Sequence, residues 1–578
     1  MTAAWDETHD VIVVGSGAGG LGTAVTAAIK GLDVVVLEKG DVFGGTTALS
    51  GGVLWVPGNG KFPDGEQPAG RSAEDYLRHE AGNAFNAARV KAFLAAAPRM
   101  VGFMESETSA VRFMPAHGFS DYHPDAPGAV STGRSIAPVP YNAVELGSEF
   151  KRLRPPLAEI TLLGMMLNAS DDVKHLFNAT KSLKSFWHVT KLISRYGRDL
   201  AVHRRATRLT NGNALIARLS RSLFDRGGEI RTSSAVEGLI CDEHGTVIGV
   251  EVVTGDRRQR IRASRGVVLA AGGFPQARDR RAQLFRHEAA GESHLSPAPP
   301  GNVGDGIRLG ESVGGKFDSA IAQPAAWIPV SRVPDKQRVR VFPHLIDRYK
   351  PGVIMVNRDG RRFTNESNSY HDVGQAMLAG TPDGGETFAW IIADHRAIRK
   401  YGLGFVKPAP FILQPYLRSG YLKSGRTAAE LAERIGIPPK AFEQTLATFN
   451  SGAANGDDPE FGRGSSSYNR YLGDPEHKPN PCVAPLATGP FYAIRVVLGD
   501  LGTFAGLATN ERGQVLRADG SSISGLYAVG NDALSIMGGA YPGGGITLGP
   551  AMTFGFLIGE QLAGQATPQD QAETHVDR

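Results

Sequence analysis

The glycine-rich segment close to the N-terminus restricts the possible folds more than any other feature of the sequence. An apolar, β-branched run at residues 10–14 comes first, glycines recur through 15–20, and an alanine-rich helical stretch at 21–30 leads to a second apolar run at 34–37. This order is typical of a strand, a tight turn, a helix and a second strand. It predicts a Rossmann-like dinucleotide-binding unit, because glycines between a strand and a helix let a phosphate approach the backbone.

The residues of this motif have separate expected roles. Gly15 allows the tight turn, Gly17 lets a pyrophosphate reach backbone amides at a helix N-terminus, and Gly20 allows the helix to pack on the strand. Glu38 follows the second strand, where its carboxylate can accept hydrogen bonds from ribose hydroxyls. The predicted cofactor residues in this region are Gly15, Ser16, Gly17, Ala18, Gly19, Gly20, Glu38 and Lys39.

Later segments of the chain predict further parts of the same buried sheet. Residues 266–273 are an apolar run that ends in two glycines, and residues 214–226 have helical spacing. Residues 229–251 resemble a strand pair that turns at 242–245. A parallel sheet buried on both faces would use such continuous apolar runs.

The C-terminal part of the chain is expected to return to this first domain. An apolar run at 525–530 is followed by a glycine-rich loop and a helical stretch at 550–562. We therefore expect residues 8–300 and 490–566 to form one domain, with 301–489 inserted as a catalytic or cap domain. Residues 567–578 are polar and without periodicity, which predicts a disordered tail.

Residues 155–205 are rich in Leu, Met and Phe and also carry several lysines and arginines. This pattern predicts a helical insertion of one or two amphipathic helices. A solvated helix face is the interpretation we prefer. Contact with a membrane surface is the alternative, and we do not predict it from sequence.

Composition excludes several classes of protein. The chain has 578 residues, is 41% hydrophobic and 21% charged, and has a formal net charge of +4, with no basic block interleaved with aromatics, so we expect no nucleic-acid partner. Cys241 and Cys482 form no CxxC pair, so we predict neither a disulfide framework nor a metal site. The N-terminus lacks the features of a signal peptide, and no apolar run is long enough to span a membrane, which predicts a cytoplasmic location.

A second cluster of small and hydroxylated residues points to the kind of dinucleotide. It covers residues 44–52, shortly after Glu38, and it is joined in sequence order by the pairs Gly272-Gly273 and Gly530-Asn531. Together these segments resemble the flavoprotein subunits of succinate dehydrogenase and fumarate reductase. The resemblance implies FAD, with the C-terminal segment beside the isoalloxazine, and no attachment signal for covalent flavin is present. The further residues expected to contact FAD are Gly45, Thr46, Thr47, Ser50, Gly51, Gly52, Val236, Ala271, Gly272, Gly530, Asn531 and Leu548.

Within that group the chain resembles the 3-ketosteroid Δ1-dehydrogenases over nearly its whole length. The resemblance implies an α/β fold with a discontinuous Rossmann-like FAD-binding domain and an inserted α+β catalytic or cap domain. Four segments carry it, in family order: 119–122 with 132–135; 362–367 with Tyr370; 499–503; and 541–545 with 548–552.

The resemblance also implies catalytic roles. The hydroxyl of Tyr541 and the amide of Gly545 would hold the steroid oxygen at carbon 3, which favours the enolate that develops when carbon 2 loses a proton. Tyr370 would take that proton, assisted by Tyr122. A hydride would then pass from carbon 1 to flavin N5, leaving a 1,2 double bond in a 3-ketosteroid, as a step of steroid catabolism.

Tyrosine is a base at neutral pH only in a special environment, because its hydroxyl ordinarily titrates near 10. Tyr370 must therefore either be favoured as tyrosinate or share its proton through Tyr122.

Three departures from the family pattern bear on substrate range. Gly544 replaces a frequent proline, Phe504-Ala505-Gly506 replaces Lys-Gly-Gly, and His123 replaces a second tyrosine. We interpret His123 as an ordinary surface or core histidine, with a proton relay as the alternative.

Three other functions stay open at this stage. A fumarate-reductase-like enoate reductase would need cations for a dicarboxylate, for which Arg134, Arg361 and Arg362 could be proposed. A steroid dehydrogenase acting at carbons 4 and 5 is the second, and a non-enzymatic flavin-binding module is the third. The electron acceptor is not legible in the sequence, and a quinone is one candidate.

Overall fold

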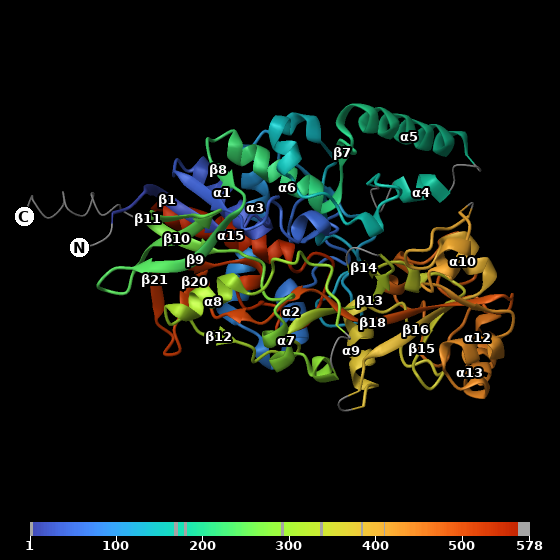
Figure 1. The fold of residues 1–578 in the computed structure, drawn as a ribbon. Coiled ribbons are helices and arrows are strands. Elements are labelled where there is room, and N and C mark those ends of the chain that lie inside the picture. The colour runs from blue at the N-terminus through green and yellow to red at the C-terminus, as the bar shows by residue number, and fades with distance from the viewer. Residues whose placement is uncertain are drawn as a thin grey trace, which may run out of the picture.

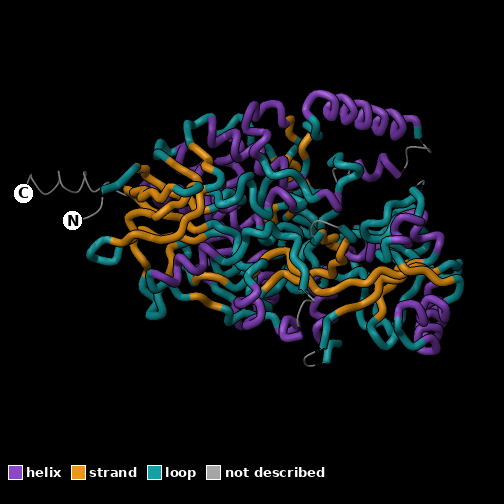
Figure 2. The backbone as a smooth tube through the Cα atoms, in the orientation of Figure 1, coloured by secondary structure: helices purple, strands orange, loops and turns teal. Residues whose placement is uncertain are grey.

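Two large β-sheets organise the protein and lie toward opposite ends of it (Figure 1 and Figure 2). The computed structural model describes residues 4–166, 172–177, 182–290, 294–335, 339–382, 385–409 and 411–564. Helices cover the larger sheet, which has eight strands, and smaller helices border the second sheet, which has six. The predicted mixed α/β architecture is confirmed.

The larger sheet joins segments that are far apart in the sequence. Its main strand order is β20-β21-β11-β1-β2-β8. Strands β21, β11, β1, β2 and β8 run parallel to one another, whereas β20 is antiparallel to β21 and β10 is antiparallel to β11. Val13 aligns with Val36 on β2 and with Val268 on β11, and Val268 in turn aligns with Tyr527 on β21. The C-terminal strand therefore returns to the N-terminal sheet. The strands are β1 (Glu7–Val14), β2 (Val34–Leu37), β8 (Glu229–Arg231), β9 (Ser234–Cys241), β10 (Val247–Thr254), β11 (Arg257–Leu269), β20 (Gln514–Leu516) and β21 (Ser522–Ala528).

The first helix begins three residues earlier than its alanine-rich stretch predicts. It is α1 (Ala18–Ile29), with Gly17 as its N-cap, so glycines of the motif form its first turn. Glycines also let it pack closely on the last helix, α15 (Leu548–Gly564). A Cβ on Gly555 would lie 2.7 Å from the Gly19 oxygen, and one on Gly559 would lie 2.7 Å from the Thr26 Cβ. The two ends of the chain are thus held together by residues without side chains.

The predicted strand pair at 229–251 is found as the antiparallel hairpin of β9 and β10. The chain reverses where the Asp242 N–H donates to the Thr246 oxygen at 3.0 Å. The predicted helix at 214–226 is α6 (Asn211–Phe224).

The second sheet is antiparallel, with strand order β14-β13-β18-β16-β15, and β17 also pairs with β18. Strand β18 (Phe491–Thr503) is central, although it follows the predicted boundary at residue 489. The division into domains stays a prediction. The other strands are β13 (Ala325–Val333), β14 (Arg340–Pro343), β15 (Val353–Val356), β16 (Phe388–Ala393) and β17 (Lys423–Gly425).

Shorter elements connect the two large sheets. The small sheets are β3-β5-β4 (Leu54–Trp55, Ser135–Pro138, Phe113–Pro115), β6-β7 (Tyr141–Asn142, Arg208–Leu209) and β12-β19 (Phe317–Asp318, Gly506–Leu507). The remaining helices are α2 (Ala73–Ala81), α3 (Ala87–Glu107), α4 (Asp172–Phe177), α5 (Leu183–His203), α7 (Arg278–Leu284), α8 (Asp305–Ser312), α9 (Tyr370–Ala379), α10 (His395–Tyr401), α11 (Gln414–Arg418), α12 (Ala428–Ile435), α13 (Pro439–Ala453) and α14 (Ser467–Tyr471).

Helices α4 and α5 occupy the segment predicted as a helical insertion, whereas the predicted tail at 567–578 lies outside the described residues. Among the described helices, none combines the length and apolar character needed to cross a bilayer. Both cysteines are free, Cys241 exposed and Cys482 buried. Within the described ranges, no cluster of three His, Cys, Asp or Glu side chains could hold a metal ion.

Candidate active site

The turn after β1 forms a backbone cradle from the first glycine motif. Gly15 has a φ of +110°, and a Cβ there would lie 2.2 Å from the Ala270 oxygen. A Cβ on Gly20 would lie 2.1 Å from the Gly15 oxygen. On Gly17 it would meet only the Thr47 Oγ1, at 3.6 Å, so this side of the turn is open to a ligand. Gly15 and Gly20 therefore have the turn and packing roles expected of them, and the contact of Gly17 with a pyrophosphate stays a prediction.

Glu38 follows β2 and is held in place by its neighbours. Its carboxylate accepts a short hydrogen bond from the Ser16 hydroxyl and a 2.8 Å bond from the Gly40 N–H. Ser16 in turn accepts from the Gly44 N–H at 2.8 Å, which ties the first glycine cluster to the second. Lys39 points elsewhere, because its Nζ pairs with the Asp305 carboxylate at 2.5 Å.

The second cluster lies directly beside the first. The Ala18 N–H donates to Thr47 Oγ1 at 3.1 Å, and a Cβ on Gly45 would lie 3.6 Å from the Gly17 Cα. The Asn302 side chain donates to Thr46 Oγ1 at 3.0 Å, a contact that the sequence did not predict.

The other predicted residues of this cluster shape the backbone. Ser50 donates to the Thr47 oxygen at 2.8 Å and accepts from the Gly52 N–H at 3.1 Å. Gly52 has a φ of +69° and approaches Asn211 closely, whereas a Cβ on Gly51 would enter open space. Val236 lies on β9 in the apolar core that also contains Val14 and Leu37.

Asp532 connects the two later glycine segments, although no sequence motif signals it. Its carboxylate accepts from the Ala271 N–H at 2.5 Å and from the Gly273 N–H at 2.9 Å. Burial raises the pKa of Asp532 to about 6, although these two backbone bonds oppose the rise. Gly272 and Gly273 both have positive φ, and Gly530 lies 3.4 Å from where a Cβ of Gly19 would be. The segments that the resemblance assigns to FAD thus meet in space.

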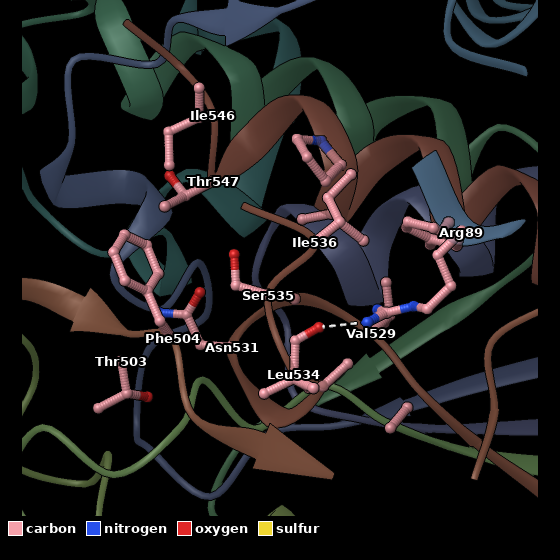
Figure 3. Close-up of a pocket in the computed structure, with 16 residues that line it drawn as sticks. Arg89, Thr503, Phe504, Val529, Asn531, Leu534, Ser535, Ile536, Ile546 and Thr547 are labelled. Carbon is pink, nitrogen blue, oxygen red and sulfur yellow. Dashed lines mark hydrogen bonds between the residues drawn. The ribbon is translucent and has the colours of Figure 1, made fainter. Parts of the chain in front are cut away.

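A pocket opens beside this C-terminal segment (Figure 3). Its walls include Gly530, Asn531 and Thr547, which comes just before Leu548, the first residue of α15. Arg89 of α3 forms another wall, with its guanidinium donating to the Leu534 oxygen at 2.8 Å, while its buried Nε has no partner. Burial lowers the pKa of Arg89 to about 10, so it is still a cation at neutral pH. A glycine cradle at a helix N-terminus and a pocket with a buried cation together fit an anionic dinucleotide such as FAD.

The loop before α15 carries Tyr541 and Gly545. Gly545 has a φ of +99°, and a Cβ there would lie 2.6 Å from the Trp55 nitrogen, so only glycine fits. Its carbonyl accepts from the Trp55 N–H at 3.0 Å. Its own N–H donates to no acceptor in the described part of the chain. That amide is therefore available to a substrate oxygen.

Tyr122 and Tyr370 meet Tyr541 from two other parts of the chain. The Tyr122 and Tyr370 hydroxyls are 3.1 Å apart. The Tyr541 ring stacks on Tyr122 at 5.5 Å between ring centroids and meets Tyr370 edge-on at 4.9 Å. Tyr122 is anchored to the Tyr541 loop because its N–H donates to the Pro542 oxygen at 2.8 Å. The structure thus brings the predicted catalytic residues together, and their roles stay a prediction.

Two further tyrosines extend this cluster, and no motif signalled them. The Tyr468 ring lies 4.4 Å from that of Tyr122, and its hydroxyl is 2.7 Å from that of Tyr349. Tyr349 also donates to the Asn368 oxygen at 3.1 Å. Tyrosine hydroxyls therefore continue away from Tyr370 into the protein.

The environment of these tyrosines favours their protonated forms. Burial raises the pKa of Tyr370 and of Tyr122 well above the usual value near 10. The neighbouring hydroxyls add to the rise at Tyr370, whereas at Tyr122 the hydrogen bond with Tyr370 opposes it. Burial also raises the pKa of Tyr541, to about 12, so this hydroxyl is a stable donor. The structure thus favours the neutral phenol at Tyr370, and the Tyr122 hydroxyl is the group placed to hydrogen-bond to it, at 3.1 Å.

His123 is neither a solvated surface histidine nor an apolar core histidine. Its Nδ1 lies 2.7 Å from Glu80 and its Nε2 lies 3.0 Å from Asp372. Burial would lower the pKa of His123, but the hydrogen bonds and negative charges of Asp372 and Glu80 raise it to about 10. The imidazolium therefore ties the segment of Tyr122 to α9, the helix that begins at Tyr370.

The arginines that a dicarboxylate substrate would need are mostly committed elsewhere. Arg134 is fully buried and pairs with Asp121 and Glu66, both at 2.7 Å. Arg362 is buried in ion pairs with Glu366 and Asp458, both at 2.8 Å. Because these cations are neutralised inside the protein, they stabilise the motif segments and are not open to a ligand.

Comparison with known proteins places this geometry in context. A family model for the FAD binding domain matches residues 10–548. A 4-oxocyclohex-2-ene-1-carboxylate 5-dehydrogenase from Sinomonas cyclohexanicum is 42% identical over 97% of this chain and 95% of its own length. A 3-oxosteroid 1-dehydrogenase from Mycolicibacterium smegmatis is 36% identical over 97% of this chain and 98% of its own.

A solved structure is similar over almost the whole fold. It is a 3-ketosteroid Δ1-dehydrogenase from Sterolibacterium denitrificans in complex with 1,4-androstadiene-3,17-dione, 34% identical, with a TM-score of 0.87 over 96% of this chain and 99% of that one. The cofactor of the present protein is FAD, and the protein is an FAD-dependent dehydrogenase. It belongs to the FAD binding domain family, together with the 3-ketosteroid Δ1-dehydrogenases to which it is similar over almost its whole length.

Proposed function

We propose that the protein introduces the 1,2 double bond into 3-ketosteroids. One observation carries this proposal: the hydroxyl of Tyr541 and the amide of Gly545, which donates to no acceptor among the described residues, lie on one loop, against the hydrogen-bonded pair Tyr122 and Tyr370. Two donors beside a potential base are what the enolisation of a ketone requires.

The two donors act on the ketone oxygen. Tyr541 and the Gly545 N–H both hydrogen-bond to the oxygen at carbon 3, and these bonds strengthen as negative charge develops there. Because burial raises the pKa of Tyr541 to about 12, its hydroxyl stays protonated at neutral pH. This withdrawal of charge acidifies the hydrogens on carbon 2.

The tyrosine pair removes a proton from carbon 2. Tyr370 accepts it in its deprotonated form, after its own phenolic proton has left to solvent, and the Tyr122 hydroxyl donates to the tyrosinate oxygen across the 3.1 Å hydrogen bond and stabilises it. Tyr468 and Tyr349 continue this series of hydroxyls into the protein. Bound FAD supplies the acceptor for a hydride from carbon 1. The substrate thus loses one proton and one hydride and gains a double bond between carbons 1 and 2.

A carboxylated ring ketone is the second candidate substrate. It is favoured by the 42% identity to the relative whose name specifies 4-oxocyclohex-2-ene-1-carboxylate, against 36% for the 3-oxosteroid 1-dehydrogenase. The same tyrosines would serve either ketone. The side chains that contact Tyr541 favour a neutral substrate, because they include Phe504 and His371, and burial lowers the pKa of His371 to about 4.

Anaerobic reduction of the bound flavin by a small panel of compounds tests the proposal. We expect 5α-androstane-3,17-dione, whose first ring is saturated, to bleach the flavin and to yield the 1-ene rather than the 4-ene product by NMR. Androst-4-ene-3,17-dione should also bleach it. Bleaching by 4-oxocyclohex-2-ene-1-carboxylate alone would favour the second candidate, and turnover of fumarate with a reduced dye but not of steroid would contradict both.

A further inference from the structure

Arg89 is a buried cation without a negatively charged partner in the protein. It lies on α3, is 5% exposed, and donates to the Leu534 carbonyl at 2.8 Å, while its buried Nε has no acceptor. Among the described residues no carboxylate pairs with it, and burial lowers its pKa without an opposing contribution from any nearby charge. An unpaired charge is costly to bury. The position of Arg89 therefore points to an anion that comes from outside the chain.

Two other buried arginines show the ordinary arrangement. Arg134 lies 2.7 Å from the Asp121 carboxylate, and Arg463 lies 3.2 Å from the Glu366 carboxylate. Each of these cations is paired inside the protein, as buried charges usually are. Arg89 differs from them because it borders a pocket and not a carboxylate.

The pocket that Arg89 borders also contains the beginning of α15. The guanidinium lies over the Phe554 ring, with its Cζ 5.4 Å from the ring centroid, and both residues line the pocket (Figure 3). Thr547 and Pro550, at the start of α15, line it as well, and no acidic side chain occupies the first turn of that helix. The N-terminus of a helix carries partial positive charge. Two positive features, one from α3 and one from α15, thus meet in a single pocket.

The position of this pocket favours the flavin ring over the pyrophosphate as its occupant. Ile546 lines the pocket and directly follows Gly545, and Phe504, another lining residue, lies 6.2 Å from Tyr541 between ring centroids. The pocket therefore borders the loop to which we assign the ketone, and a hydride passes only to a ring beside its donor. The pyrophosphate is expected elsewhere, at the glycine motif and the N-terminus of α1.

We propose that Arg89 is the charge partner of the reduced flavin. Uptake of a hydride at N5 adds two electrons and one proton to the neutral oxidised ring, which thereby gains one negative charge. The Arg89 guanidinium balances that charge, so the reduced state is stabilised more than the oxidised state and hydride uptake is favoured. The inference rests on the proposed function only in placing the ketone at the Tyr541 loop, and the identity of the ketone plays no part in it.

The midpoint potential of the bound flavin tests the proposal without any substrate. It is measured against a reference dye in the FAD-loaded wild type, in Arg89→Gln, which removes the charge, and in Arg89→Lys, which keeps it. We expect Arg89→Gln to lower the equilibrium constant for reduction at least about tenfold, which is about 30 mV for a two-electron couple. Arg89→Lys should lose less, within about threefold, because the ammonium group is still a cation.

Sulfite supplies a second measurement. It adds to N5 of the oxidised flavin with its own electron pair, so the ring gains the same negative charge as in reduction by hydride. The Kd for sulfite should rise at least about tenfold in Arg89→Gln and by less than about threefold in Arg89→Lys. The reduced wild type should also keep the spectrum of the anionic reduced flavin from pH 8 to pH 6, a reading that needs no variant.

The matched control is Arg218→Gln, which removes a buried guanidinium of α6 that donates to the Val139 and Pro140 carbonyls and does not line this pocket. It should change the equilibrium constant for reduction and the Kd for sulfite by less than about twofold, because the two sites are independent. Flavin absorbance and Tm verify that each variant is loaded and folded. If Arg89→Gln does not hold FAD, Arg89→Lys and the spectrum of the wild type decide.

Two results would overturn the proposal. One is an unchanged potential and an unchanged Kd for sulfite in Arg89→Gln, with a Kd for FAD that rises, which would assign Arg89 to the pyrophosphate. The other is a wild-type reduced flavin that is neutral at pH 8, since a neutral ring needs no charge partner. Neither result bears on Tyr370 or Tyr541. Conversely, a failure of every ketone to bleach the flavin would contradict the proposed function and leave these potentials unchanged.

Discussion

The glycine cradle and the tyrosine cluster are built in opposite ways. The cradle uses backbone: Gly15 and Gly20 leave no room for a Cβ, and most of its residues fall within the first fifty or so positions. The cluster uses side chains, and Tyr122 and Tyr370 are 248 residues apart in sequence. The glycine cradle therefore depends on local backbone conformation, whereas the tyrosine cluster depends on how three distant segments pack together.

This contrast predicts two separable readouts. Changes in the cradle should alter the amount of FAD bound per protein, and changes in the cluster should alter turnover per bound FAD. A variant that lowered the FAD content and the turnover per bound FAD by the same factor would contradict this separation of the two sites.

The largest effect is expected for Tyr370→Phe. Loss of the hydroxyl removes the group that accepts the proton from carbon 2, so turnover per bound flavin should fall by about 10²–10⁴-fold. Stopped-flow flavin reduction by a ketosteroid measures it, with FAD content unchanged. Tyr492→Phe, a buried tyrosine of β18 whose hydroxyl is 3.1 Å from His395, is the control and should retain near-normal rates. A wild-type rate in Tyr370→Phe would remove this residue from the mechanism.

Tyr541→Phe should have the next largest effect. It removes one of two donors to the ketone oxygen, and loss of one such donor costs about 10²–10³-fold in turnover.

The pH profile of flavin reduction separates the roles of Tyr370 and Tyr541. Because the pKa of the base is raised, flavin reduction should accelerate as the pH increases from 6 to 10, and Tyr541→Phe should lower the profile without changing its slope. A profile that is flat in the wild type would argue against a tyrosine base.

Gly15→Ala tests the cradle. A Cβ would lie 2.2 Å from the Ala270 oxygen, and a positive φ costs a non-glycine residue about 1–2 kcal/mol. We expect the Kd for FAD to rise about tenfold or more, measured by flavin fluorescence, while the turnover of the remaining holoenzyme changes little. Gly31→Ala is a matched control, since Gly31 has a φ of +89° and a Cβ there would meet nothing within 4 Å. Equal losses of FAD in both variants would assign the effect to general strain.

The smallest effect is expected for His123→Gln, which removes the charge that ties Tyr122 to α9. The pKa of His123 in the folded protein, about 10, exceeds its ordinary value near 6.5. The stabilisation is therefore complete below pH 6.5 and is lost as the pH rises toward 10. We expect a loss of about 1–2 kcal/mol in the free energy of unfolding at pH 6, seen as a few degrees in Tm.

The difference in Tm between His123→Gln and the wild type should shrink as the pH approaches 10. His9→Gln, which removes a pair with the largely exposed Asp33, should show a smaller difference. A difference that grows with pH would contradict the assignment of an imidazolium to His123.

Local sequence predicted the cradle well because each part of it is a short-range property. The run at 34–37 is β2 with the expected bounds, Gly15 takes a positive φ that only glycine adopts easily, and Gly20 leaves no room for a Cβ. The start of α1 was predicted three residues late, because alanine content marks helices better than glycine does, although Ala18 already begins the first turn. The family resemblance, and not periodicity, supplied Tyr122, Tyr370, Tyr541 and Gly545.

The residues that the sequence did not signal share one property. Each of them contacts a residue from a distant segment, by a hydrogen bond or a ring contact, and none belongs to a sequence motif. They are Asn302, Asp532, Arg89 and Tyr468. His123 likewise could be interpreted only after Glu80 and Asp372 were seen on either side of it.

The sequence by itself therefore determined that a dinucleotide is held by backbone near the N-terminus, because glycine spacing dictates local dihedral angles. It also predicted one or two amphipathic helices within residues 155–205, where α4 and α5 lie. Only the tertiary structure decided which face of α5 is left in solvent and that the Tyr122 hydroxyl reaches Tyr370. Burial, ion pairing and the pKa of a side chain depend on neighbours that the chain brings together from hundreds of residues away.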